Sequence, residues 1–193
     1  MSTNKGMNTK KLALLSLLTA LTAILAYFGG FIKVGGLASI SLTLIPVVIG
    51  GALCGKNAGA WLGAVSGAVF FLTPDSAFWL GLSAVGTVVT VMIKAIAAGW
   101  MAGLIYEVLE KKNRYAAVIA AAVVCPIVNT GIFLIGCFLF FLETVKELAG
   151  GAEMSVGSYL IIFFVGLNFV FELLFNVVLS PVILRLINIR KKS

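Results

Sequence analysis

Two ionisable side chains lie deep inside apolar stretches of the sequence. Lys94 falls halfway along one long apolar run, and Glu172 falls halfway along another. A charge at the centre of a lipid bilayer costs roughly 3 kcal/mol or more, so such a residue faces a charged partner or a wet cavity. Two interpretations stay open at this point. The two residues form a polar ligand site shared by two helices, or they form a structural ion pair that holds the helices together.

Amide side chains accompany these charges. Asn168, Glu172 and Asn176 are spaced four residues apart, so they share one helical face among Phe, Val and Leu. Asn129 lies near the middle of another apolar run and follows Pro126, whose missing N–H leaves a helical carbonyl without its donor. Buried amides in a bilayer seek hydrogen-bond partners. Their convergence near one level predicts a ligand cavity, and hydrogen bonds between helices are the alternative.

One aromatic residue extends this candidate site. Trp79 stands near the outer end of an expected helix, close to Asp75 and Phe78. Tryptophan is common where a helix meets the membrane surface, and the alternative is an aromatic lid over a ligand. The predicted substrate-binding residues are Trp79, Lys94, Asn129, Asn168, Glu172 and Asn176.

The sequence lacks the residues that several kinds of metal site and catalytic site require. The sequence has no histidine, and its three cysteines show no C-x-x-C spacing. A zinc site, a Ser-His-Asp triad and a haem histidine are therefore not expected. The chain also has no phosphate-binding G-x-x-x-x-G-K-S/T loop and no carboxylate pair with catalytic spacing. We expect no metal, no cofactor and no enzyme activity, and any ATP hydrolysis must come from another protein.

The composition indicates that lipid surrounds the elements that carry these residues. The 193 residues are 61% hydrophobic and 11% charged, whereas soluble domains are about half apolar and about a quarter charged. We expect an all-α membrane protein that forms a single transmembrane domain over residues 1–193. The net charge of +7 is attributed to loops that set topology rather than to nucleic-acid binding.

The apolar stretches divide the chain into a bundle of about six transmembrane helices. The second stretch is too short to span comfortably, so it is tilted or partly re-entrant. A glycine-containing acidic segment, 143–157, is expected to be a loop. The expected helices cover residues 11–28, 41–54, 58–72, 77–109, 115–142 and 159–189.

The basic residues predict the orientation of the bundle. With the N-terminus in the cytoplasm and alternating spans, Lys33 and Lys146 lie outside and Lys94 lies within the membrane. The cytoplasmic segments then hold 11 of the 14 basic residues, namely Lys5, Lys10, Lys11, Lys56, Lys111, Lys112, Arg114, Arg185, Arg190, Lys191 and Lys192. This bias favours a multi-pass protein of the cell membrane with both termini in the cytoplasm.

Small residues recur at spacings of three or four residues in two helices. Gly59, Gly63 and Gly67 form a row that lets another helix approach closely. A strip of small residues on the first helix is either internal packing or a docking face for another membrane protein. This strip consists of Ala13, Ser16, Ala20 and Ala23.

The sequence resembles the substrate-binding S component of an energy-coupling factor (ECF) transporter, a vitamin importer. The resemblance covers essentially the whole chain. It rests on the opening of the first helix, KKLALLSLLTALTA at 10–23, and on SLTLIPVVIGGALCGKNAGA at 41–60. In the second stretch Lys56-Asn57 replaces the proline region usual in the family.

The resemblance implies a fold, partners and a docking motif. S components are six-helix proteins that bind one micronutrient on the extracellular side, mostly with helices four to six and the outer loops. A separate membrane coupling subunit and two ATPase subunits drive uptake, and the S component topples in the membrane lipid to release its ligand. The family's Ala-x-x-x-Ala docking motif corresponds here to Ser16 and Ala20, so the resemblance favours docking for the strip.

The ligand and the mode of transport remain open from the sequence. The overall pattern is most similar to the pantothenate-type branch, and Lys94 suits a carboxylate, although Glu172 would neutralise it. Riboflavin, hydroxymethylpyrimidine and folate-like ligands are the alternatives. A self-sufficient carrier or channel that uses Glu172 as a proton site is the alternative to an ATP-driven importer.

Overall fold

The computed structural model describes residues 9–29, 31 and 41–192, and every regular element in these ranges is helical. The expected all-α membrane fold is confirmed. In chain order the elements are α1 (Thr9–Gly29), α2 (Leu44–Cys54), α3 (Lys56–Phe70), α4 (Pro74–Leu82), α5 (Ala84–Leu109), α6 (Arg114–Phe140), α7 (Leu142–Gly151), α8 (Val156–Tyr159), the π-helical segment η1 (Leu160–Val165) and α9 (Gly166–Lys192).

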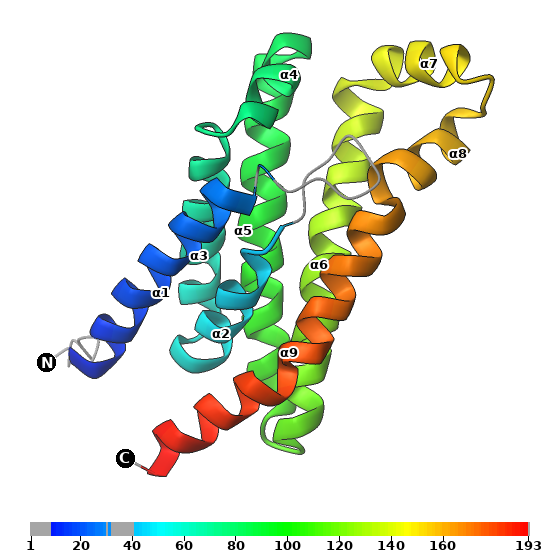
Figure 1. Ribbon diagram of the computed structural model, residues 1–193. Helices are drawn as coiled ribbons and strands as arrows, with labels where there is room; N and C mark the ends of the chain where they lie inside the picture. The colour runs from blue at the N-terminus through cyan, green and yellow to red at the C-terminus, as the bar shows by residue number, and fades with distance from the viewer. Residues whose placement is uncertain (1–8, 30, 32–40, 193) are drawn as a thin grey trace, which may run out of the picture.

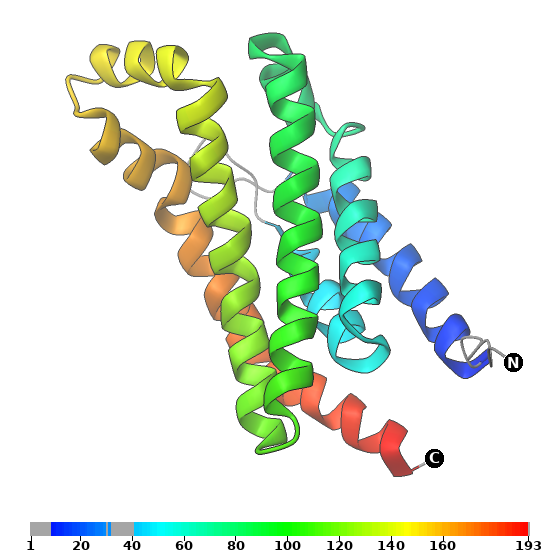
Figure 2. The ribbon, with the colours of Figure 1, turned by 180° about the vertical axis from the view of Figure 1, so that it is seen from behind.

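The long helices run between two distinct ends of the molecule. Both chain termini lie at one end, together with the α2–α3 and α5–α6 turns, and α4, α7 and α8 lie at the other (Figures 1 and 2). We call these the terminal end and the distal end. Lys146 and the acidic residues of α4 and α7 belong to the distal end. The described basic residues at the terminal end are Lys10, Lys11, Lys56, Lys111, Lys112, Arg114 and Arg185, whereas Lys33 lies outside the described residues.

The helices differ in their ability to cross a bilayer. Among the described residues, α1, α5 and α6 are each long and apolar enough to cross a membrane. α3 and α4 pass the same test as a pair but bend by 83° at the break between them. α2 has 11 residues, so it is about 16 Å long and shorter than the hydrocarbon core of a bilayer.

The expected fourth helix, 77–109, is interrupted at Ser83, and that part of the prediction is corrected. Ser83 has an extended backbone, and its Oγ accepts a hydrogen bond from the Gly86 N–H at 3.1 Å. The Thr87 hydroxyl donates to the Trp79 carbonyl at 2.7 Å across the same break. These bonds satisfy groups that a helix end exposes, so the chain turns from α4 into α5 at Ser83.

The acidic segment 143–157, expected to be a loop, contains the amphipathic helix α7. Val145 and Ala149 are buried, whereas Glu143, Lys146 and Glu147 are exposed. The apolar pair has the i, i+4 spacing of one helical face. The prediction of a loop was wrong because it rested on the polar composition of the segment, which also suits a short helix that packs over the distal end of the bundle.

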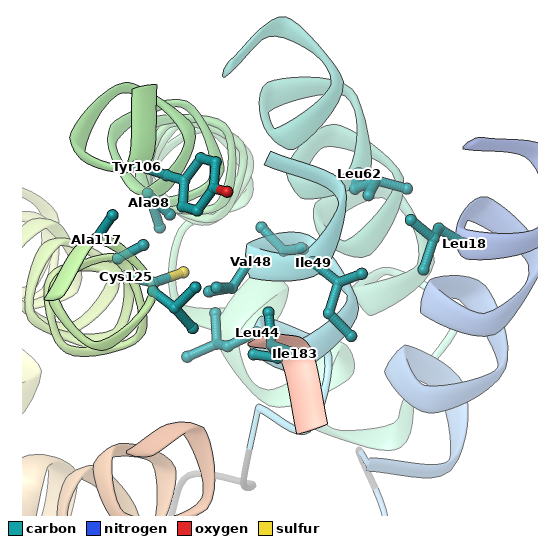
Figure 3. Packing of buried hydrophobic residues seen from close by; sticks show 14 of the residues in the cluster. Leu18, Leu44, Val48, Ile49, Leu62, Ala98, Tyr106, Ala117, Cys125 and Ile183 are labelled. Carbon is teal, nitrogen blue, oxygen red and sulfur yellow. The ribbon is translucent and has the colours of Figure 1, made fainter. Parts of the chain in front are cut away.

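The short helix α2 lies at the centre of a buried apolar cluster. Figure 3 shows Val48 and Ile49 of α2 between Leu62 of α3 on one side and Tyr106 and Cys125 of α5 and α6 on the other. Lipid tails are as apolar as these side chains, so close packing rather than exclusion of water stabilises such contacts within a membrane. The cluster therefore holds α2 in place although α2 is too short to span.

Helices α3 and α5 approach each other through glycine, as the glycine row predicts. A Cβ atom added to Gly59 would overlap the carbonyl group of Gly99, and one added to Gly99 would overlap the carbonyl group of Gly59. A Cβ added to Gly63 would meet the Ala95 carbonyl. The contact leaves no room for a methyl group, which confirms internal packing for the row.

Replacing Gly59 by alanine should destabilise the protein, because the added methyl group forces the backbones of α3 and α5 apart. Overpacking of this kind typically costs about 1–3 kcal/mol. The melting temperature in detergent, followed by size-exclusion chromatography after heating, measures the effect. Gly131→Ala is the control, because no atom lies within 4 Å of its added Cβ. Equal melting temperatures for Gly59→Ala and the wild type would contradict the prediction.

Candidate functional site

A cavity lies inside the bundle between its two ends. Residues of α1 to α6 and α9 line it. Leu44 and Val47, which belong to the cluster around α2, form the wall toward the terminal end, and Trp79 and Phe141 form the distal wall. The cavity offers about 130 Å³ to the centres of water molecules. A space of this size accommodates a small organic molecule.

Lys94 reaches this cavity from the middle of α5. Its side chain is half-buried and lines the cavity. Its Nζ lies 4.9 Å from the centre of the Phe133 ring on α6, within the range of a cation–π interaction. In the described part of the chain Lys94 forms no salt bridge with Glu172 or Asp75. The structure therefore does not contain the close ion pair that the sequence left open.

Glu172 lines the cavity from α9 and is 5% exposed. Its Oε1 accepts a hydrogen bond from the Ser41 backbone N–H at 2.9 Å. Ser41 begins the turn that leads into α2, and among the described residues Glu172 is the acceptor for its N–H. Glu172 thus has a structural contact of its own while it faces the same cavity as Lys94.

Asn129 faces the cavity from α6, one helical turn before Phe133. Its side chain is 6% exposed and lines the cavity. Among the described residues its amide forms no hydrogen bond. Because Asn129 lines the cavity, the donor and acceptor groups of its amide are open to a molecule in the cavity.

Trp79 forms the distal wall rather than a membrane-surface anchor. It is 7% exposed, and its ring makes edge contacts with Phe133 and Phe141 at 5.5 and 5.3 Å between centres. Both phenylalanines also line the cavity. The aromatic lid is the interpretation that agrees with this placement.

Several polar residues of the cavity were missed at the sequence level. The spacing of Thr87, Thr90 and Lys94, at i, i+3 and i+7, was a readable signal of one polar face on α5. Asp75 was noted beside Trp79 but not assigned to the site, and it lines the cavity from the first turn of α4. The further missed polar residues are Ser41, Thr43, Ser66 and Thr130.

Two of the predicted site residues are not placed in the cavity. Asn176 is buried beside it, where its Nδ2 donates to the Glu172 backbone carbonyl at 2.8 Å and its Oδ1 has no partner among the described residues. The second residue is Asn168, two helical turns before Asn176 on α9. Its side chain lies outside the described residues. The polar stripe on α9 therefore reaches the cavity through Glu172.

The small-residue strip on α1 faces outward. Ala13, Ser16 and Ala20 are exposed, and Ala23 is half-buried. The Ser16 hydroxyl donates to the Leu12 carbonyl of the same helix at 3.0 Å, so its hydrogen is satisfied within α1. Three of the four residues in the strip are therefore accessible to a partner.

The chain matches one protein family over almost its whole length. The family described as ECF transporter, substrate-specific component matches residues 10–184. The chain belongs to this family. No curated protein and no solved structure matches the sequence.

Membership in the ECF substrate-specific component family agrees with the cavity and the apolar helices. Proteins of this family are membrane transporter subunits, so the chain is a substrate-specific transporter subunit of a membrane and not an enzyme. In the described ranges no cluster of His, Cys, Asp or Glu has the geometry of a metal site. The family does not specify the solute.

Removal of the Glu172 side chain should destabilise the protein by about 1–3 kcal/mol, because the Ser41 N–H loses its acceptor inside the bundle. Glu172→Ala is compared with Glu172→Gln, whose side-chain carbonyl still accepts that bond. Thermal unfolding in detergent, followed by tryptophan fluorescence, measures both variants. We expect a clearly lower melting temperature for alanine only, and equal losses for the two variants would show that the charge matters rather than the bond.

Proposed function

We propose that the protein is the S subunit of an ATP-driven ECF importer. It captures a vitamin or related micronutrient from outside the cell, and a membrane coupling subunit with two ATPase subunits drives delivery to the cytoplasm. The observation that carries the proposal is the polar cavity of Lys94, Asn129 and Glu172 in a chain of this family. The absence of an ATP-binding loop from the sequence fits a subunit that depends on separate ATPases.

The charge distribution supports an orientation with both termini in the cytoplasm. Basic residues gather at the terminal end, whereas the distal end carries Glu143, Glu147 and Glu153 with Lys146. Positive residues favour the cytoplasmic side of a membrane. The distal wall of the cavity then faces the outside, where a solute is captured.

The exposed strip on α1 is the proposed docking face for the coupling subunit. Small residues let two membrane helices approach closely enough for backbone contacts. Ala13, Ser16 and Ala20 present such a surface along the outside of the bundle.

Pantothenate is the first candidate solute. It is a small, flexible and polar vitamin whose hydroxyl and amide groups match the amide of Asn129 and the hydroxyl groups around the cavity. The competing function is a self-sufficient proton-coupled carrier, which the burial of Glu172 in the cavity wall favours. Uptake by the isolated protein in a proton gradient would support the carrier, and uptake that requires the coupling subunit and ATPases supports the importer.

Vitamin binding should quench the fluorescence of Trp79. Trp61 and Trp100 are exposed and lie outside the cavity lining, so replacing both by phenylalanine leaves one tryptophan, in the cavity wall. We expect saturable quenching at sub-micromolar concentration by one compound from a panel of water-soluble vitamins. Absence of any response in folded protein would contradict vitamin binding and favour the carrier.

Ser16→Leu and Ala20→Leu should abolish uptake by the assembled transporter and leave vitamin binding unchanged, because a bulky side chain blocks close approach of the coupling subunit. Uptake of labelled vitamin and fluorescence titration measure the two effects separately. Gly131→Leu on α6 is the matched control, because space is open around its Cβ. Equal loss of uptake and binding would contradict the docking role.

A further inference from the structure

The charged groups of the cavity differ in the interactions that they make within the protein. Among the described residues, three charged side chains line it: Asp75, Lys94 and Glu172. Glu172 accepts the Ser41 N–H at 2.9 Å, and Asp75 has an interaction of its own within the protein. Lys94 has no salt bridge to a described residue. The Lys94 ammonium group is therefore without an oppositely charged partner in contact among the described residues.

The surroundings of Lys94 hold the ammonium group without satisfying its donors. The Phe133 ring lies 4.9 Å from Nζ and attracts the positive charge through its face. A ring face does not replace the oxygen acceptors that three N–H donors require. The Asn129 amide, on the same helix as Phe133 and also without a hydrogen bond among the described residues, adds a donor and an acceptor at this place.

The charges that line the cavity limit which chemical group of a solute could bind Lys94. A cationic solute would be repelled by the ammonium group of Lys94, while the two carboxylates that line the cavity are already engaged, Glu172 by the Ser41 N–H and Asp75 by an interaction within the protein. A phosphate with two negative charges would meet one cation while two carboxylates, Asp75 and Glu172, line the same small cavity. A single carboxylate matches the one cation, and charge-assisted hydrogen bonds of this kind are the strong ones in a protein interior.

Taking the proposed function as given, we infer that the transported solute carries one carboxylate, which binds Lys94 beside the Asn129 amide. The apolar part of the solute then lies against Phe133 and Trp79. Glu172 is not the partner of Lys94 in this arrangement. It remains bound to Ser41 and limits the site to solutes with a single negative charge.

Pairs of vitamins and their uncharged analogues test this inference directly. Pantothenate with panthenol, biotin with biotin amide, and nicotinate with nicotinamide differ at the carboxylate and in little else. Riboflavin and thiamine complete the set as vitamins without a carboxylate. Isothermal titration calorimetry of the purified full chain in detergent measures each dissociation constant. We expect the tightest ligand to be a carboxylate that binds on the order of 100-fold more tightly than its uncharged analogue.

Variants of two lysines show whether Lys94 causes the preference. Lys94→Gln should bring the dissociation constants of the carboxylate and its analogue within a few-fold of each other, whereas Lys94→Arg should keep the preference. Lys56→Gln is the matched control, because Lys56 also lies near an aromatic ring, that of Trp100, but at the terminal end outside the cavity. It should leave the preference intact.

The outcomes separate this inference from the proposed function. Tightest binding by riboflavin or thiamine, or equal binding of both members of the preferred pair by the wild type, would overturn the carboxylate assignment and leave the vitamin-binding subunit in place. A preference that persists in folded Lys94→Gln would also overturn it. Binding of no compound, either in this set or in a panel extended to folate and hydroxymethylpyrimidine, would overturn the proposed function, and this inference with it.

Discussion

The position of α2 and of one cavity wall depends on the hydrogen bond from the Ser41 backbone N–H to the Glu172 carboxylate. This bond joins α9 to the turn before α2, 131 residues earlier in the chain. α2 is too short to span a bilayer, yet Val48 at its centre is completely buried. A carboxylate inside a bundle is costly unless it is hydrogen-bonded. Glu172 therefore fixes the start of α2 and keeps one charged wall of the cavity in place.

The cavity exists because apolar packing closes it on two sides while polar groups interrupt that packing between them. Toward the terminal end, α2 fills the space between α3, α5, α6 and α9 (Figure 3). Toward the distal end, α7 places Val145 and Ala149 on the cluster that contains Trp79 and Phe141. Between these clusters, the described residues that line the wall include hydroxyl groups and three charged side chains. Buried polar groups need hydrogen-bond partners, so this space suits a polar molecule.

The sequence predicted the membrane fold and the convergence of Lys94, Asn129 and Glu172, because charge and amide groups within apolar runs are a strong signal. It did not predict the break at Ser83 or the helix within 143–157. Both depend on short-range hydrogen bonds and on tertiary contacts of a few apolar residues, which hydropathy over a long window does not resolve. The spacing also grouped Asn176 with Glu172, although a helical face is broader than the edge of a cavity.

One helix takes part in both the cavity and the outer surface. Leu25 and Ala26, near the end of α1, line the cavity, whereas Ser16 lies on the exposed strip. The nine residues from Ser16 to Leu25 span about 14 Å along the helix axis. Trp61 of α3 holds the middle of α1 by donating to the Thr19 hydroxyl at 3.2 Å. Part of the cavity wall and the outward-facing strip therefore lie on one continuous helix, without any intervening loop.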